Sequence, residues 1–83
     1  MASPAPMDKA EILVDARGHR CPVPTLRLRR AAEAAAAGAR IRLLADDPMA
    51  RIDVPHFAGQ SGLELIETVE LNGGVSFLLG KPA

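Results

Sequence analysis

The sequence predicts an α+β domain, a two-layer open sandwich in the order β-α-β-α-β-β with a mixed four-stranded sheet and both helices on one face. Apolar stretches with the alternation typical of strands lie at residues 11–15, 40–45, 63–71 and 75–79. Two helical stretches separate the first three, so crossover connections should make the first two strands parallel. An Asn-Gly pair between the last two strands predicts a hairpin.

The chain length of 83 residues fits one small domain with a modest core and no large enclosed cavity. We expect residues 1–9 to be a disordered leader, because they hold two prolines and no periodic pattern, and residues 10–83 to form the domain. Met1 and Met7 are both possible natural starts. A secretion signal and an apolar run of membrane-spanning length are absent from the sequence, which predicts a cytoplasmic protein without a membrane partner.

The charge distribution favours protein partners. The formal net charge is zero, and the aromatic residues are Phe57 and Phe77, which argues against direct nucleic-acid binding. Five arginines nevertheless lie between Arg17 and Arg30, so one face should be basic. We expect a monomer that meets an acidic surface of another protein.

The first strand, residues 11–15, carries apolar residues on both faces, which suggests an interior strand or a partly covered outer face. Asp15 at its end should pair with an arginine, orient the following loop, or serve as an ordinary turn residue. Gly18 supplies the backbone freedom that this loop needs. Loops at the carboxyl ends of parallel strands are where chemistry tends to gather in such sheets.

The first helix is predicted over residues 22–37, with Cys21 at or near the N-cap, Pro22 as the first helical residue and Pro24 as the third. Gly38 should end it. Arg27 and Arg30 fall on its exposed side, where they bind a partner or form a solvated face.

The second helix should begin at Asp46-Asp47-Pro48, with a capping carboxylate and a proline in the first turn. Pro55 lies too far inside to be neutral, so either the helix kinks there or two shorter helices meet near Asp53. Phe57 should anchor the segment in the core, and Gly62 should end it.

The two sheet faces should differ in what covers them. Val75, Phe77 and Leu79 are expected to face the helices. The other face should carry four apolar side chains, and these are Leu13, Leu44, Ile66 and Leu78.

Cys21 is the sole cysteine, which excludes an internal disulfide and a cysteine-cluster zinc site. His19 and His56 add too few ligands for a metal, so we predict no metal and no cofactor. The start of a helix and the nearby Arg17 and Arg20 should lower the pKa of the thiol. The alternative is that Cys21 is a small buried apolar residue without chemistry.

The ten residues from Asp15 to Pro24 read D-A-R-G-H-R-C-P-V-P and resemble the D-x-x-G-x-x-C-P-x-P signature of TusA-like, or SirA-like, sulfur-carrier proteins. The stretches L-A-D-D-P at residues 44–48 and D-V-P at residues 53–55 resemble the second block of that family. The resemblance extends over nearly all of residues 12–79.

The resemblance implies a carrier that accepts sulfane sulfur on Cys21 as a persulfide and relays it to an acceptor protein. Donors in that family are cysteine desulfurases or rhodanese-like enzymes, and the covalent persulfide takes the place of a cofactor. The supporting motif residues would be Asp15, Arg17, Gly18, Arg20, Pro22 and Pro24. Whether such a carrier counts as an enzyme, a sulfurtransferase acting by relay, stays open.

Three positions depart from the family pattern and leave the partner unidentified. His19 stands where an apolar residue is usual, and either moves protons or is an exposed loop residue. Val23 replaces a glutamate of the thiouridine-pathway member, and Ala58 replaces a cysteine that some relatives carry. Transfer RNA thiolation, molybdenum-cofactor maturation and sulfur oxidation all remain open as pathways.

Two other function classes stay open. An activated Cys21 would also suit a thiol redox or peroxide sensor that stops at sulfenic acid or a mixed disulfide. A regulatory or nucleic-acid-binding module would rest on the small α/β fold, which is poor evidence of function.

Overall fold

In this computed structural model the chain is described at residues 11–20 and 22–82. The elements alternate as predicted. In chain order they are β1 (Glu11–Asp15), α1 (Val23–Ala34), β2 (Arg40–Ala45), α2 (Ala50–Ser61), β3 (Glu64–Leu71) and β4 (Gly74–Gly80).

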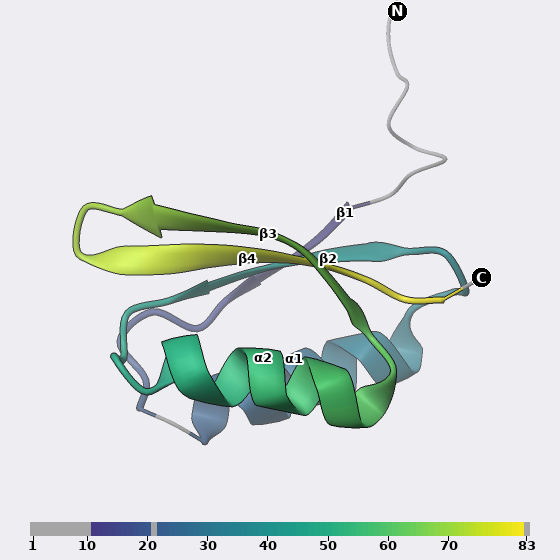
Figure 1. Cartoon of the computed structure of the whole chain (residues 1–83), viewed down its shortest axis with the longest axis horizontal. Coiled ribbons are helices and arrows are strands. Elements are labelled where there is room, and N and C mark those ends of the chain that lie inside the picture. Colours follow the sequence, from purple (N-terminus) through teal and green to yellow (C-terminus); the bar gives the residue numbers. More distant parts are fainter. Residues whose placement is uncertain (1–10, 21, 83) are drawn as a thin grey trace, which may run out of the picture.

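The four strands form one mixed sheet in the order β1-β2-β4-β3. β1 and β2 are parallel, whereas β4 runs antiparallel to both of its neighbours. Both helices lie on the same side of the sheet, which makes two layers (Figure 1). The predicted fold class is therefore confirmed, including the parallel first pair and the hairpin at Asn72-Gly73.

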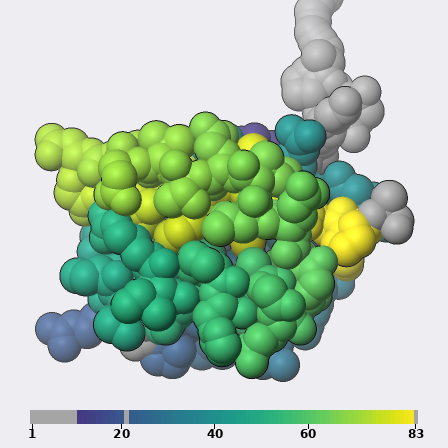
Figure 2. Space-filling view, viewed as in Figure 1, coloured from purple at the N-terminus to yellow at the C-terminus, as the bar shows by residue number. Residues whose placement is uncertain are grey.

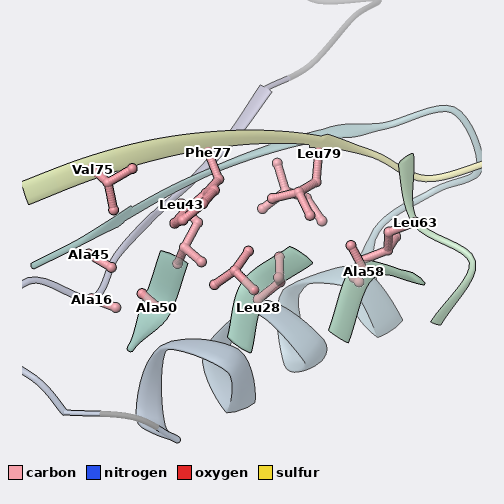
Figure 3. Close-up of a cluster of buried hydrophobic side chains, with 13 residues drawn as sticks. Ala16, Leu28, Leu43, Ala45, Ala50, Ala58, Leu63, Val75, Phe77 and Leu79 are labelled. Atoms are coloured by element: carbon pink, nitrogen blue, oxygen red, sulfur yellow. The ribbon is translucent and has the colours of Figure 1, made fainter. Parts of the chain in front are cut away.

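The core fills the space between the sheet and the helices. Val75, Phe77 and Leu79 of β4 point toward the helices, as predicted, and meet Leu28 of α1 and Ala58 of α2 there (Figure 3). Small residues on both helices allow a short distance between helix and sheet, so the core side chains fill the space without voids.

β1 is an edge strand, so the first of the two sequence-based interpretations, an interior strand, is wrong. Its apolar residues are not covered on both faces: Ile12 and Val14 pack against the core, while Leu13 is 63% exposed on the open face.

The open sheet face carries the predicted apolar residues with unequal exposure. Leu78 is buried at 5% exposure, while Ile66 is 40% exposed. A β-bulge between Leu65 and Glu67 shifts the register of β3, which simple alternation did not predict.

α1 begins one residue later and ends earlier than predicted. Pro22 is the N-cap, and Pro24 is the second helical residue rather than the third.

The helix ends at Ala34 with Ala35 in an extended conformation, so Gly38 is not its terminator. The physical reason is Lys81, whose Nζ donates to the carbonyls of Ala32 and Ala35 at 2.8 and 2.7 Å and satisfies the free end of the helix.

α2 is one continuous helix through Pro55, which decides against two shorter helices. It starts at Ala50 with Met49 as N-cap, later than the predicted Asp-Asp-Pro start. Asp47 still shapes the entry, because its carboxylate accepts the Met49 N–H at 3.0 Å and its carbonyl accepts the Ala50 N–H at 2.9 Å.

The apolar anchors of α2 also differ from the prediction. Ala50, Val54 and Ala58 are the buried residues of the helix, whereas Phe57 is only partly buried against the core. Gly62 ends the helix as predicted, with a left-handed φ of 76°.

α2 and β3 form one continuous surface in the space-filling view, with β4 showing in small patches between them (Figure 2). Every residue of β4 is buried, which agrees with this view. Within the described parts of the chain, neither helix is long and apolar enough to cross a membrane.

Candidate functional site

The β1–α1 and β2–α2 loops meet at the carboxyl end of the parallel pair, where both helices also begin (Figure 1). The Ala16 N–H continues the pairing of the two strands by donating to the Leu44 carbonyl at 2.8 Å. Just beyond, the Gly18 N–H lies 3.0 Å from both carboxylate oxygens of Asp46. The two loops are therefore fastened together at the base of the segment that leads to Cys21.

Asp15 and Arg17 form a two-point ion pair within the first loop. Arg17 Nε and Nη2 donate to the two carboxylate oxygens at 2.9 and 2.7 Å, and the Arg17 N–H adds a third contact at 3.2 Å. These hydrogen bonds lower the pKa of Asp15 from its usual 3.8 to about 2. The prediction that Asp15 pairs with an arginine is confirmed, and the carboxylate stays ionised at neutral pH.

Gly18 has the backbone freedom that the sequence predicted for it. Its φ of 87° is a conformation that residues with a side chain rarely adopt. This turn aims its N–H at Asp46, and the next residue returns toward the strand, since the His19 N–H donates to the Ala16 carbonyl at 3.3 Å.

Cys21 itself lies outside the described residues. The N-cap of α1 is Pro22, so Cys21 is not the N-cap, and the predicted position of its thiol near the cap stays a prediction. The residues on either side of it are tied together. The Val23 N–H donates to the Arg20 carbonyl at 2.9 Å, and this bond spans Cys21 and Pro22 in the chain. Arg20 is thus held close to the first residue of α1.

The two prolines of the motif differ in their surroundings. Pro22 is exposed, and its carbonyl accepts the Leu26 N–H at 3.0 Å and the Thr25 hydroxyl at 2.8 Å. Pro24 is among the fully buried side chains. Pro22 therefore shapes the turn, while Pro24 fixes the start of the helix to the core.

A shallow depression of about 440 Å³ borders the β1–α1 loop, which is called the thiol loop because its sequence contains Cys21. Its walls come from both loops, and the lining residues are Gly18, His19, Arg20, Asp46, Asp47 and Pro48. His19 and Arg20 are exposed. Within residues 11–20 and 22–82 the Arg20 guanidinium makes no ion pair, in contrast to Arg17, so its charge faces the solvent beside the thiol loop.

Arg27 and Arg30 lie away from this depression, on the flank of α1 that faces β1. Arg27 Nη1 donates to the Asp15 carbonyl at 3.2 Å, which the sequence did not predict. Both arginines line a groove with Leu13, Val14 and Leu26. The structure thus separates the predicted partner-binding residues from the predicted thiol site, with Asp15 between them.

Asp46 is the site residue that the sequence analysis missed. The Asp-Asp-Pro pattern was interpreted as a helix cap, but the N-cap is Met49, and Asp47 shapes only the turn before it by accepting the Met49 N–H. The available signal was the second acid, since a helix entry needs one capping carboxylate. In the described part of the chain, His, Asp and Glu residues form no group of three that could hold a metal ion.

The chain is similar to known proteins of one family over most of its length. Residues 12–81 match the family described as "Sulfurtransferase TusA". The chain is 44% identical over 62 residues to a "Putative sulfur carrier protein" from Archaeoglobus fulgidus, covering 75% of this chain and 80% of the relative. It is 38% identical over 68 residues to a "Sulfur carrier protein TusA" from Allochromatium vinosum, covering 82% and 90% of the two chains.

The fold also matches a solved structure. The crystal structure of a SirA-like protein from Desulfitobacterium hafniense superposes with a TM-score of 0.76 at 30% sequence identity. The match covers 87% of this chain and 99% of that one.

Proposed function

This chain belongs to the TusA sulfurtransferase family, and from that premise we propose that it is a sulfur carrier that holds sulfane sulfur on Cys21 as a persulfide. The sulfur comes from a donor protein and passes to an acceptor protein. The observation that carries the proposal is the hydrogen bond from the Val23 N–H to the Arg20 carbonyl at the start of α1, because these two residues flank the sole cysteine of the sequence.

The chemistry requires one reactive thiolate and no second cysteine. The Cys21 thiolate attacks the outer sulfur of a donor cysteine persulfide, a sulfur–sulfur bond forms, and the donor cysteine leaves as a thiolate. The acceptor thiolate then attacks the outer sulfur of Cys21–S–SH in the same way, so sulfur moves with no net oxidation. A neighbouring thiol would discharge the persulfide as a disulfide, and this chain has none.

The described residues supply the surroundings for these steps. Asp46 and Gly18 hold the loop, Arg20 supplies a positive charge that favours a thiolate or persulfide anion, and the shallow depression leaves room for a partner's cysteine. We assign donor docking to Arg27 and Arg30, whose charges attract an acidic surface. No cofactor is needed, because the persulfide is the reactive group.

The decisive experiment is intact mass spectrometry after incubation with a cysteine desulfurase and cysteine. We expect a gain of about 32 Da, one sulfur atom, which a reductant reverses. Cys21→Ser is the matched control and should gain nothing. A wild-type protein that gains only oxygen, in steps of about 16 Da, would contradict the carrier function and favour a thiol redox sensor.

A further inference from the structure

The groove between β1 and α1 is separate from the depression beside the thiol loop. It has a volume of about 490 Å³ and is lined by Leu13, Val14 and Asp15 of the strand and by Leu26, Arg27, Arg30 and Ala31 of the helix. Leu26 of the helix is 52% exposed, and Leu13, whose side chain lies on the open sheet face at the same strand edge, is 63% exposed. Exposed leucines beside a free strand edge mark a place where another chain can bind.

The edge of β1 offers backbone groups to such a chain. Within the described residues β1 pairs with β2 alone. The Ala16 N–H points to β2. Because backbone groups alternate along a strand, the N–H and C=O of Val14 also point to β2, whereas those of Leu13 point away from it, to the edge of the sheet. The Asp15 carbonyl points to the same edge as the backbone groups of Leu13. There it accepts a hydrogen bond from Arg27 of α1 and not from β2.

The charge of the groove is positive. Asp15 is neutralised by its two-point pair with Arg17, whereas Arg30 makes no ion pair within residues 11–20 and 22–82. Arg27 uses one guanidinium N–H on the Asp15 carbonyl and keeps others for a ligand. A chain that fits here is therefore extended, acidic, and carries apolar side chains on one face.

We propose that this groove binds an extended acidic segment of a sulfur-relay partner, which adds to β1 as a further strand. Leu13 supplies the backbone hydrogen bonds, and its side chain on the open sheet face contacts the segment's apolar side chains. Arg27 and Arg30, on the helix side of the sheet, bind the carboxylates on the segment's other face. The identity of the partner rests on the proposed function. The mode of binding does not involve Cys21, so the two ideas can fail separately.

The test uses the full chain in reductant, with no sulfur donor present, and the peptide acetyl-Glu-Val-Glu-Leu-Glu-Val-Glu-amide as probe. Hydrogen exchange followed by NMR reports on the edge directly. At saturating peptide we expect the Leu13 amide to exchange at least tenfold more slowly. The Val14 amide, which already faces β2, should change less than twofold and serves as the internal control.

Charge reversal identifies the binding site. Arg30→Glu should weaken binding of the peptide at least tenfold, and Leu13→Glu should do the same by placing a carboxylate on the edge. Arg40→Glu is the matched control, because it makes the same change in net charge at an exposed position of β2 outside the groove. It should alter the affinity less than threefold.

Several outcomes would overturn the proposal. The absence of saturable binding, binding without protection of the Leu13 amide, or equal losses in Arg30→Glu and Arg40→Glu would each do so. Protection of Leu13 without peptide would mean that the chain's own first ten residues, or a second copy if the protection rises with concentration, cover the edge. None of these results would affect the persulfide measurement.

Discussion

At the scale of single residues, Arg17 and Arg20 lie in the same loop, between β1 and α1, but have different surroundings. The guanidinium of Arg17 is neutralised by Asp15, whereas that of Arg20 faces solvent without an ion pair in the described part of the chain. A positive charge stabilises a nearby thiolate only to the extent that an anion does not already balance it. Arg20 should therefore contribute more than Arg17 to the reactivity of Cys21.

This difference predicts distinct effects of two matched variants. Arg20→Ala should raise the pKa of the Cys21 thiol and slow its alkylation by iodoacetamide near neutral pH by several-fold. Arg17→Ala should have a smaller effect, since it removes a cation and frees an anion together. The pH dependence of the alkylation rate measures both. Equal shifts in the two variants would show that the loop arginines act alike.

Asp15 gives the molecule an acid-sensitive contact. Its pKa of about 2 in the folded protein lies below the usual 3.8, because Arg17 hydrogen-bonds to the ionised form. The pair therefore stabilises the fold fully above pH 4, and this contribution is lost as the pH falls from about 4 to about 2. NMR titration should find the low midpoint, and Arg17→Gln should return it toward the usual value. A low midpoint that survives in Arg17→Gln would exclude this cause.

At the scale of elements, the C-P-x-P motif combines two proline roles. Pro24→Ala removes fully buried atoms and frees the unfolded chain, so it should lower the free energy of unfolding by about 2 kcal/mol. Pro22→Ala changes an exposed cap and should cost less than about 1 kcal/mol while altering thiol reactivity. Urea unfolding and alkylation rates measure these effects. Similar stability losses in both variants would contradict the division.

The elements themselves could be predicted from the sequence because their signals are local. Alternation identified the strands, and Asn72-Gly73 identified the hairpin within one residue. The end of α1 was not predictable, because Lys81, far along the chain, donates the hydrogen bonds that cap its C-terminus. The role of Asp46 was not predictable either, since its carboxylate accepts the N–H of Gly18, 28 residues away in the other loop, and the N-cap of α2 is Met49.

The candidate site was predictable to a similar extent. The motif located Asp15, Gly18 and the prolines, and the structure brings their loop against the second block. The pairing of Arg17 with Asp15 and the contact of Arg27 with the Asp15 carbonyl depend on side-chain directions that spacing does not determine. For Cys21 the sequence remains the source of the assignment, because the thiol lies outside the described residues.

At the scale of the whole molecule, the sheet has one covered face and one open face. On the open face Arg42 of β2 connects to every other strand. It donates to Glu11 of β1 and to Ser76 of β4, each at 3.0 Å, and its Nη2 lies 3.8 Å from Glu67 of β3. A charged network at the centre of a sheet face that also carries exposed leucine and isoleucine opposes association through that face.

This role predicts the behaviour of Arg42→Met. The substitution keeps the long apolar stem but removes the charge, so Leu44, Leu78 and the new side chain would form a continuous apolar strip, beside carboxylates that have lost their partner. We expect a folded protein that self-associates at tens of micromolar, increasingly at high salt, because salt screens the remaining repulsion. Arg40→Met is the control, because Arg40 lies at the end of β2 on the same face and takes no part in the network. Sedimentation equilibrium should find wild type and Arg40→Met monomeric and Arg42→Met associating; a monomeric Arg42→Met would mean that the open face resists association without its charged centre.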